Sequence, residues 1–291
     1  MSKFRLLMAR QCGEKIAADG GFTGFPVDPF AIAAKEEILV EAKDPDRKGM
    51  SGCIVFTDDG VGIIYATDIR SEGFRRFTVA HELGHYFLDG HPEEIAKTGP
   101  VHFSRAGFVQ GNSSIEIEAD HFASGLLMPT RLTREALYQA PIGLGGVQHL
   151  ATVAEASLTA AAIRTAECAP YPVAIIVSER EQVSYGFMSE SFKKLGKLRF
   201  LRKGDGLPHT GTRAFNAVAD NIRLGRSVCY QSTLADWFGG PAGTIIDEEV
   251  VGLGSYGYTL TVLSSEALTD DPYEDEDEEA ALLESWAPKF R

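Results

Sequence analysis

Apolar residues recur every three or four positions in several segments of the first 170 residues, which places them on one face of a helix. This spacing predicts helices over residues 29–42, 74–88, 116–128, 131–139, 147–155 and 158–167. Asp28 and Pro29 favour the start of the first helix, as N-cap and first helical residue. Pro129 ends the third helix, because proline does not continue a helix.

Other segments carry the shorter apolar runs that are typical of strands. Residues 52–57 and 61–66 lie on either side of Asp58-Asp59-Gly60, which predicts a β-hairpin. Beyond Pro170 the pattern changes, and we expect strands over residues 173–177, 182–187 and 258–263 with a helix over residues 212–224 between them. The predicted fold class is α+β, with a second, α/β domain that begins near residue 170.

We expect four parts: a first domain over residues 1–130, a small helical bundle over 131–170, an α/β domain over 171–265 and an acidic tail over 266–291. Within the tail, residues 270–279 hold eight acidic residues and no basic one, so they account for eight units of the formal net charge of −13 and leave −5 elsewhere. A solvated, disordered segment is the simplest interpretation of the tail. The overall acidity therefore says little about nucleic acid as a partner.

The composition excludes several classes of protein. Hydrophobic residues make up 44% of the chain and charged residues 24%, which rules out a wholly disordered chain. No apolar run reaches eighteen residues, so we expect no membrane partner, and residues 6–9 are too short for a secretory signal. The four cysteines are scattered without a CxxC pair, which fits reduced thiols in a cytoplasmic protein and argues against zinc held by cysteines.

The strongest chemical motif is His81-Glu82-Leu83-Gly84-His85, an HExxH sequence inside the helix expected over residues 74–88. Residues four positions apart lie on one helix face, so both imidazoles can bind a single metal ion. Glu82 lies about 100° further round the helix, where it can accept a proton from water at the metal rather than bind the metal itself. A core helix that happens to contain two histidines is the alternative interpretation.

A catalytic zinc site needs a third protein ligand and one open position for water. His91 has the outer spacing of the metzincin motif, but Leu88 stands where those enzymes have a glycine that turns the chain back to the metal. Glu118, in the next helix, completes a His2Glu set and shares a helix face with Phe122, so we expect it to point inward as the third ligand. Glu116 falls on the opposite side, where we expect it to be solvated.

The stretches RFTVAHELGH and EIEADHFASGLLMP resemble the ImmA/IrrE family of bacterial metallo-endopeptidases, and residues 26–33 are similar to that family's entry segment. The resemblance is specific over about residues 25–130 and weaker up to residue 170. It implies a minimal gluzincin-like peptidase core followed by further domains.

The same resemblance implies that His81, His85 and Glu118 bind zinc and that Glu82 is the general base. Manganese or cobalt would also suit these ligands. The implied substrate is a helix-turn-helix transcriptional repressor, whose cleavage switches on stress, DNA-damage, mobile-element or phage-defence genes. Some members carry a carboxy-terminal GAF-like sensor, and residues 171–265 would suit such a GAF/PAS-like domain.

Several residues near the motif have open roles. Asp120 is expected either to orient a ligand histidine as a hydrogen-bond acceptor or to serve at the surface or as a helix cap. Tyr86, His102 and His121 are candidates for stabilising an oxyanion, and each has a purely structural alternative. Residues 91–114 contain few periodic apolar residues, which predicts an irregular connection, either a lid over the site or a disordered insertion.

A basic segment runs against the overall acidity of the chain. Residues 192–203 contain two aromatic residues, no acidic residue and six basic ones, which are Lys193, Lys194, Lys197, Arg199, Arg202 and Lys203. Backbone-tracking charge with interleaved aromatics is how proteins bind single strands without sequence preference. Single-stranded nucleic acid is therefore a candidate activator, with the acidic tail as its competitor, and a solvated face or a partner for the tail are the alternatives.

Two other functions compete with the peptidase. In the first, the protein is a non-catalytic sensor or adaptor with a structural metal site, but such a site has no use for the base Glu82. In the second, residues 131–168 form a DNA-binding helix-turn-helix, but residues 158–167, the would-be recognition helix, carry Arg164 as their one basic residue. The sequence favours a cytosolic zinc endopeptidase with a separate sensory domain.

Overall fold

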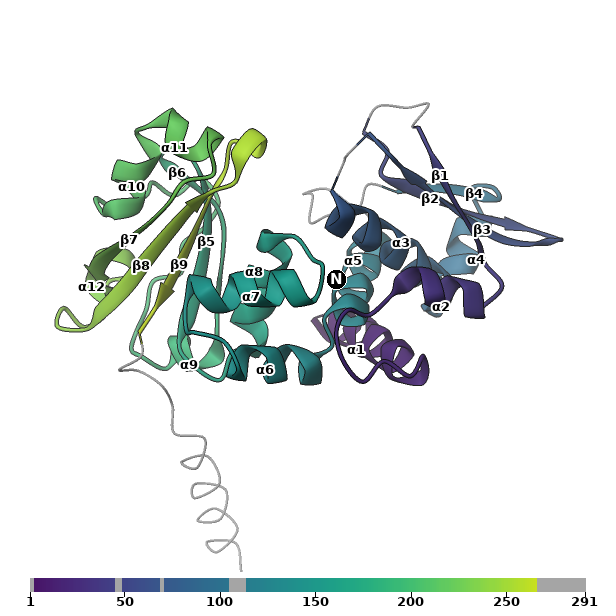
Figure 1. Ribbon diagram of the computed structural model, residues 1–291, viewed down its shortest axis with the longest axis horizontal. Helices are drawn as coiled ribbons and strands as arrows, with labels where there is room; N and C mark the ends of the chain where they lie inside the picture. Colours follow the sequence, from purple (N-terminus) through teal and green to yellow (C-terminus); the bar gives the residue numbers. More distant parts are fainter. Residues whose placement is uncertain (1–2, 45–48, 69–70, 105–113, 266–291) are drawn as a thin grey trace, which may run out of the picture. The chain divides into compact units, whose positions relative to one another are not determined.

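The computed structural model describes residues 3–44, 49–68, 71–104 and 114–265. The chain divides into two compact units: residues up to 139 with residues 148–164, and residues 140–147 with the chain from residue 165 onwards. Each unit combines a β-sheet with helices (Figure 1). The protein is therefore of mixed α and β structure with two sheets.

The first unit contains a four-stranded sheet in the order β1-β3-β2-β4. Its strands are β1 (Leu39–Lys43), β2 (Gly52–Thr57), β3 (Gly60–Ala66) and β4 (Val101–Ser104). β2 and β3 form the expected hairpin, in which Thr57 pairs with Gly60. β1 runs parallel to β3, and β4 runs antiparallel to β2 at an edge of this sheet.

The helices of this unit are α1 (Lys3–Asp19), α2 (Pro29–Lys35), α3 (Glu72–Phe87), α4 (His91–Ala96), α5 (Ser114–Leu127) and α6 (Thr130–Tyr138), while α7 (Leu144–Val153) and α8 (Leu158–Cys168) cross the division between the units. α3 and α5 lie side by side, and α1 packs along α5 (Figure 1). Glycines permit both contacts. A Cβ at Gly84 of α3 would lie 3.1 Å from Ala119 Cα, and one at Gly13 of α1 would lie 2.2 Å from the Phe122 carbonyl oxygen.

The apolar spacing predicts α3, α5, α6, α7 and α8 to within a few residues. The prediction of one helix over residues 29–42 is wrong beyond Lys35. The helix ends there, Glu37 adopts a positive φ of 56°, and the following residues form β1. The cause is tertiary, because β1 obtains its backbone partners from β3 rather than from its own neighbours in the chain.

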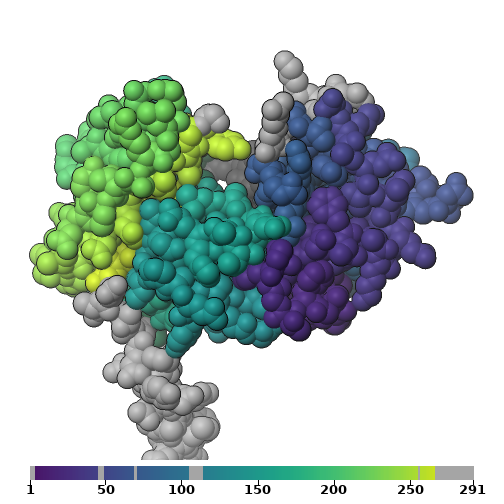
Figure 2. Space-filling view, in the orientation of Figure 1, coloured from purple at the N-terminus to yellow at the C-terminus, as the bar shows by residue number. Residues whose placement is uncertain are grey.

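Two other segments differ from expectation. The apolar residues of α1 do not predict this helix, because they do not all lie on one buried face. Phe4 and Met8 are 66% and 48% exposed. The purple amino-terminal part of the chain is visible at the surface of the first unit (Figure 2). Residues 91–114 are not wholly irregular, because they include α4, with Pro92 in its first turn, and β4. Residues 105–113 lie outside the described part of the chain.

The second unit is built on a five-stranded antiparallel sheet in the order β6-β5-β9-β8-β7. The strands are β5 (Val173–Glu179), β6 (Gln182–Met188), β7 (Ser227–Thr233), β8 (Ile245–Gly252) and β9 (Thr259–Ser264). Between them in the chain lie α9 (Glu190–Lys193), α10 (Gly211–Asn216), α11 (Ala219–Arg223), α12 (Leu234–Phe238) and the short 3-10 turn η1 (Gly254–Tyr256). Phe192, Trp237 and Ile246 are among the buried residues of its core.

The three strands predicted in this unit are confirmed as β5, β6 and β9, whereas β7 and β8 are not predicted by the apolar runs. The helix expected over residues 212–224 is two helices, α10 and α11, because Val218 takes an extended conformation between them. The acidic tail from residue 266 lies outside the described residues. Among the residues that are described, no helix combines the length and apolar character needed to cross a bilayer.

Candidate metal centre

Helix α3 brings two histidines to one point. Ser71 caps the helix by accepting a hydrogen bond from Phe74 N at 3.3 Å, and the HExxH motif follows nearly three turns later in the buried part of the helix. His81 and His85 are fully buried, and their Nε2 atoms lie 3.2 Å apart. Both imidazoles therefore face the same place, as the four-residue spacing predicts.

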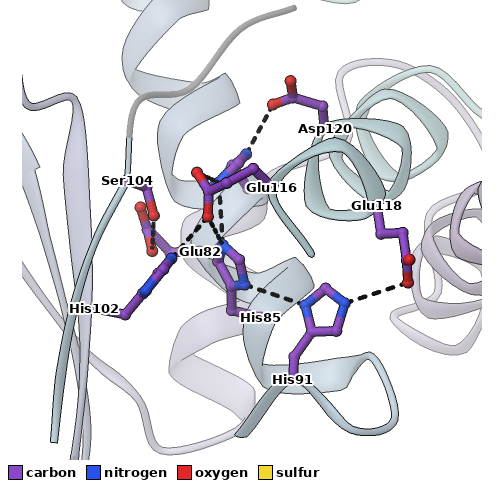
Figure 3. A network of polar contacts seen from close by, with 9 residues as sticks. Glu82, His85, His91, His102, Ser104, Glu116, Glu118 and Asp120 are labelled. Carbon is purple, nitrogen blue, oxygen red and sulfur yellow. Dashed lines mark hydrogen bonds and ion pairs between the residues drawn. The ribbon is translucent and has the colours of Figure 1, made fainter. Parts of the chain in front are cut away.

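Glu116 of α5 completes this group. Its Oε1 lies 3.2 Å from His85 Nε2 and its Oε2 lies 3.6 Å from His81 Nε2. One candidate ligand atom from each of the three residues lies within 4.8 Å of the other two. Figure 3 shows the Glu116 carboxylate meeting His85 and His102. We call His81, His85 and Glu116 the three-residue cluster.

The expected third ligand is thus in a different place. Glu118 does not lie beside the histidine pair: its Oε2 accepts a hydrogen bond from Arg5 of α1 at 2.8 Å and lies 3.4 Å from His91 Nε2. The expectation that Glu116 is solvated is wrong, since it is 8% exposed. Two residues correspond to about 200° on a helix, so the two carboxylates face opposite sides of α5.

The error has an identifiable cause. α5 is buried on two sides, by α3 and by α1, so an apolar stripe through Phe122 does not say which side holds the histidines. A better signal was available in the sequence, because Glu116 and Asp120 are four residues apart and share a helix face. Pairing Glu116 with a residue already expected to orient a histidine of the motif would have pointed to the carboxylate that lies beside the histidine pair in the structure.

His91, the other candidate for the third ligand, lies behind His85. It begins α4, it is fully buried, and its Nδ1 lies 3.1 Å from His85 Nδ1. His85 presents its Nε2, the opposite ring nitrogen, to His81 and Glu116. His91 therefore contacts His85 on the side of the ring that faces away from His81 and Glu116.

Asp120 and the strand β4 surround the cluster. Asp120 Oδ1 lies 2.8 Å from His81 Nδ1, which is the contact expected of a residue that orients this imidazole. His102 Nε2 lies 2.7 Å from Glu116 Oε1, and the Ser104 hydroxyl donates to Glu82 Oε2 at 3.2 Å. His102 and Ser104 are two residues apart on β4 and so point to the same face of the sheet.

Of the three oxyanion candidates, His102 reaches the cluster, and its side chain is 19% exposed. The ring of Tyr86 packs against that of Phe87, with centroids 4.9 Å apart. His121 is half-buried on α5, next to Asp120 in the chain.

The three residues of the cluster differ in charge. Burial lowers the pKa of His81, but the hydrogen bonds to Asp120 and Glu116 outweigh it and raise this pKa to about 10. Burial lowers the pKa of His85 to about 3. Burial would raise the pKa of Glu116, but its bonds to His102, His81 and His85 hold that pKa well below its usual range. An ionised carboxylate thus lies between a protonated and a neutral imidazole.

Glu82 stands beside the cluster as a separate carboxylate. Burial raises its pKa to about 7, and it is fully buried. Among the described residues, its Oε1 has no hydrogen-bond partner, which is costly for a buried carboxylate oxygen. Gly52 of β2 leaves room for this atom, because a Cβ there would lie 2.8 Å from Glu82 Oε1.

These residues fit a divalent metal ion. Two imidazole nitrogens and one carboxylate oxygen form the His2Glu donor set of hydrolytic zinc sites, and they converge without a cysteine. The hydrogen bonds to Asp120 and Glu116 that raise the pKa of His81 favour a positive charge at this cluster. Among the described residues Glu82 Oε1 has no hydrogen-bond partner, so this atom can accept a hydrogen bond from a water molecule.

The basic segment, residues 192–203, exposes fewer aromatic and unpaired basic side chains to a nucleic acid than its composition suggests. Phe192 is fully buried in the core of the second unit, so Phe200, which is 56% exposed, is the aromatic residue of the segment at the surface. Lys193 forms an ion pair with Glu190, and Arg199 lies 3.3 Å from Asp205. The other basic residues of the segment, all exposed, are Lys194, Lys197, Arg202 and Lys203.

Comparison with known proteins agrees with this geometry. A solved Mycobacterium tuberculosis transcriptional regulator is similar in fold, with a TM-score of 0.52 at 15% identity over 89% of this chain and 77% of that one. None of the curated proteins has a matching sequence. Residues 48–165 match the family model of the IrrE N-terminal-like domain, Peptidase_M78, and this range includes both α3 and α5. Residues 48–165 are therefore similar to the IrrE N-terminal-like domain, the ImmA/IrrE type that the HExxH and α5 motifs resemble.

Proposed function

We propose that this protein is a metal-dependent endopeptidase, with zinc as the favoured metal and manganese as an alternative. One observation carries the proposal. His81, His85 and Glu116 converge within 4.8 Å, and Glu82 of the same helix keeps a buried carboxylate oxygen unpartnered beside them, as far as the described residues go. Three protein ligands with an adjacent base are the arrangement of hydrolytic rather than structural zinc sites. The match to the Peptidase_M78 model supports the same activity.

The chemistry follows from the positions of the side chains. A divalent metal on the three-residue cluster supplies Lewis acidity, which polarises a scissile carbonyl and acidifies water. Glu82 accepts the proton of the attacking water and delivers it to the leaving amine nitrogen, so the C–N bond breaks after the C–O bond has formed. A pKa of about 7 suits Glu82 to both transfers near neutral pH. Asp120 holds the Nδ1 proton of His81, which leaves Nε2 free as a ligand atom.

We further propose that His102 is the group that stabilises the oxyanion. It belongs to the edge strand β4, its Nε2 reaches Glu116, and its side chain is partly exposed. An extended peptide that added to this edge would bring its carbonyl groups past His102. Replacing His102 with phenylalanine should lower kcat more than it raises KM, because the contact forms in the transition state.

The substrate we propose is a helix-turn-helix repressor, and the second unit is proposed to be a GAF/PAS-like sensor that regulates cleavage. The family resemblance supports both, and a five-stranded antiparallel sheet with a buried core provides a separate domain for the sensor. Single-stranded nucleic acid remains our candidate activator. Exposed Lys194, Lys197 and Arg202 support it, while the burial of Phe192 limits stacking to Phe200.

The test is cleavage of repressors encoded beside the gene, with and without a chelator and single-stranded DNA. We expect cleavage that a chelator abolishes, that Glu82→Gln abolishes without loss of metal binding, and that Glu93→Gln leaves intact. Glu93 is an exposed residue of α4 and serves as the matched control. Metal binding without cleavage of any repressor would favour the non-catalytic adaptor instead.

The DNA-binding alternative receives no support from Arg164, the one basic residue of its would-be recognition helix over residues 158–167. Arg164 is 1% exposed, its Nε donates to the Met128 carbonyl at 3.0 Å, and its guanidinium also contacts Thr130 and Glu14. A side chain that holds the first unit together in this way cannot read a DNA groove without leaving its partners.

A further inference from the structure

A row of polar side chains leads from His85 to the surface of the first unit. His91 Nδ1 lies 3.1 Å from His85 Nδ1, and His91 Nε2 lies 3.4 Å from Glu118 Oε2. Arg5 of α1 donates to the same Glu118 oxygen at 2.8 Å. Figure 3 shows His91 between His85 and Glu118, on the side of His85 that faces away from Glu116. We call His91, Glu118 and Arg5 the outer row.

Only one assignment of donors and acceptors satisfies the hydrogen bonds from His85 to the outer row. If His85 Nε2 is a ligand atom it carries no proton, so the proton of the neutral ring is on Nδ1. His85 Nδ1 then donates to His91 Nδ1, which must be an acceptor, and the proton of His91 is on Nε2. His91 Nε2 in turn donates to Glu118, a carboxylate that can accept from both His91 and Arg5.

From this geometry we propose that His91, Glu118 and Arg5 are positioning residues for the metal site, which fix the tautomer and ring orientation of His85. The inference rests on the proposed function, since it assigns a role only if the three-residue cluster binds a metal. It also explains why a second glutamate is buried so close to the cluster. Glu118 is 4% exposed but serves the site through His91 rather than as a ligand.

The outer row joins the metal site to a helix outside the matched domain. Arg5 lies on α1, whereas residues 48–165 contain all the other members. α1 is held against α5 by close backbone contact, because a Cβ at Gly125 would lie 2.2 Å from the Arg10 carbonyl oxygen. The amino-terminal helix is thus placed to influence how tightly the metal is bound.

Removing the hydrogen-bond partner of a metal-binding histidine lowers metal affinity by about 10- to 100-fold. We expect a loss of this size for His91→Phe, which fills the space of the ring but can neither accept from His85 nor donate to Glu118. Arg5 is 57% exposed and lies at the end of the row, so Arg5→Ala should weaken binding only by about 3-fold.

The experiment measures zinc affinity of the full chain by competition with a chromophoric chelator, and the visible absorption of the Co2+-loaded protein. His91→Phe should weaken zinc binding and alter the Co2+ bands, which report ligand geometry. His91→Gln should restore most of the affinity, because its amide can accept from His85 and donate to Glu118. His149→Phe, the same substitution at a half-buried histidine of α7, is the matched control and should change neither readout.

Glu118 gives the second arm. Glu118→Gln keeps an oxygen that accepts from His91 and Arg5, so we expect near-normal zinc affinity, whereas Glu118→Ala should lose about as much as His91→Phe. Thermal unfolding of each metal-free variant, followed by circular dichroism, separates a positioning effect from loss of the fold. If Glu118→Gln abolished binding and changed the Co2+ bands, Glu118 would be a ligand and the inference would be overturned.

The outcomes separate the inference from the proposed function. If neither zinc nor Co2+ binds the unaltered protein, the proposed function itself is contradicted. If zinc binds the unaltered protein tightly and binds a well-folded His91→Phe variant equally tightly, only the positioning role of the outer row is overturned.

Discussion

Glu116 and Glu118 stand two residues apart on α5 and serve opposite sides of it. Glu116 Oε1 lies 3.2 Å from His85 Nε2, while Glu118 Oε2 lies 2.8 Å from the Arg5 guanidinium. His85 is connected to both, directly through Nε2 and through His91 at Nδ1. His85 therefore contacts one carboxylate directly and reaches the second only through His91, so only Glu116 is in position to share a metal with it.

The first prediction follows from this contrast. Replacing Glu116 with glutamine removes the charged oxygen donor of the three-residue cluster, and we expect zinc affinity to fall by more than the ~100-fold that losing an outer partner can cost. The rise in melting temperature that zinc causes should be lost in this variant, because zinc that does not bind cannot stabilise the folded state. Differential scanning calorimetry with and without zinc measures this. An unchanged shift in Glu116→Gln would exclude Glu116 as a ligand.

Metal binding should release a proton from His81. The pKa of His81 is raised to about 10, so at pH 8 the imidazole is protonated, whereas the pKa of His85 is lowered to about 3 and that ring is already neutral. A metal ligand must be neutral imidazole, so we expect His81 to release about one proton at pH 8, in addition to the proton lost by water that the metal acidifies. Zinc affinity should accordingly rise with pH up to about 10 and fall as pH falls.

Titration calorimetry in buffers of different ionisation enthalpy counts this proton. A pH of 8 lies above the pKa of about 7 of Glu82, which is therefore ionised before the metal binds. Asp120→Asn weakens one of the contacts that raise the pKa of His81 and should reduce the number of protons released. Equal heats in all buffers would show that His81 is neutral before binding.

Gly52 provides a test of the space around the base. A Cβ at this position would lie 2.6 Å from Thr78 Cγ2 and 2.8 Å from Glu82 Oε1, so Gly52→Ala requires these two buried side chains to shift. We expect a loss of about 1–3 kcal/mol in the free energy of unfolding. Urea denaturation measures it, with Gly24→Ala as the control, since no atom lies within 4 Å of a Cβ there. A neutral Gly52→Ala would mean that Glu82 is not confined as described.

Arg164 should contribute to the stability of the fold and not to DNA binding. Its guanidinium donates to the Met128 carbonyl at 2.6 Å and to the Thr130 hydroxyl at 3.1 Å. Arg164→Met leaves these groups without their charged donor and should cost about 1.5–3 kcal/mol in the free energy of unfolding. Arg134→Met, at an exposed position of α6, should cost much less. Duplex DNA binding that disappeared in a stable Arg164→Met would restore the DNA-binding hypothesis.

The histidine pair and five helices of the first unit and its boundary could be predicted because their causes are local. His81 and His85 face one point because a helix turns through about 100° per residue, and α3, α5, α6, α7 and α8 follow from apolar spacing alone. The pattern fails where a neighbour decides the structure. Residues 39–43 become β1 because β3 supplies their backbone partners, and α1 is helical although its Phe4 and Met8 face solvent.

From the order of residues alone come the HExxH helix, its base and the expectation that a carboxylate from the next helix joins two histidines. Which carboxylate does so was decided by tertiary packing. α5 is covered by α3 on one side and by α1 on the other, so both Glu116 and Glu118 are buried and a single-helix pattern cannot tell them apart. Gly84 lets α3 approach the face that bears Glu116, and the glycine contacts of α1 bring Arg5 to the face that bears Glu118.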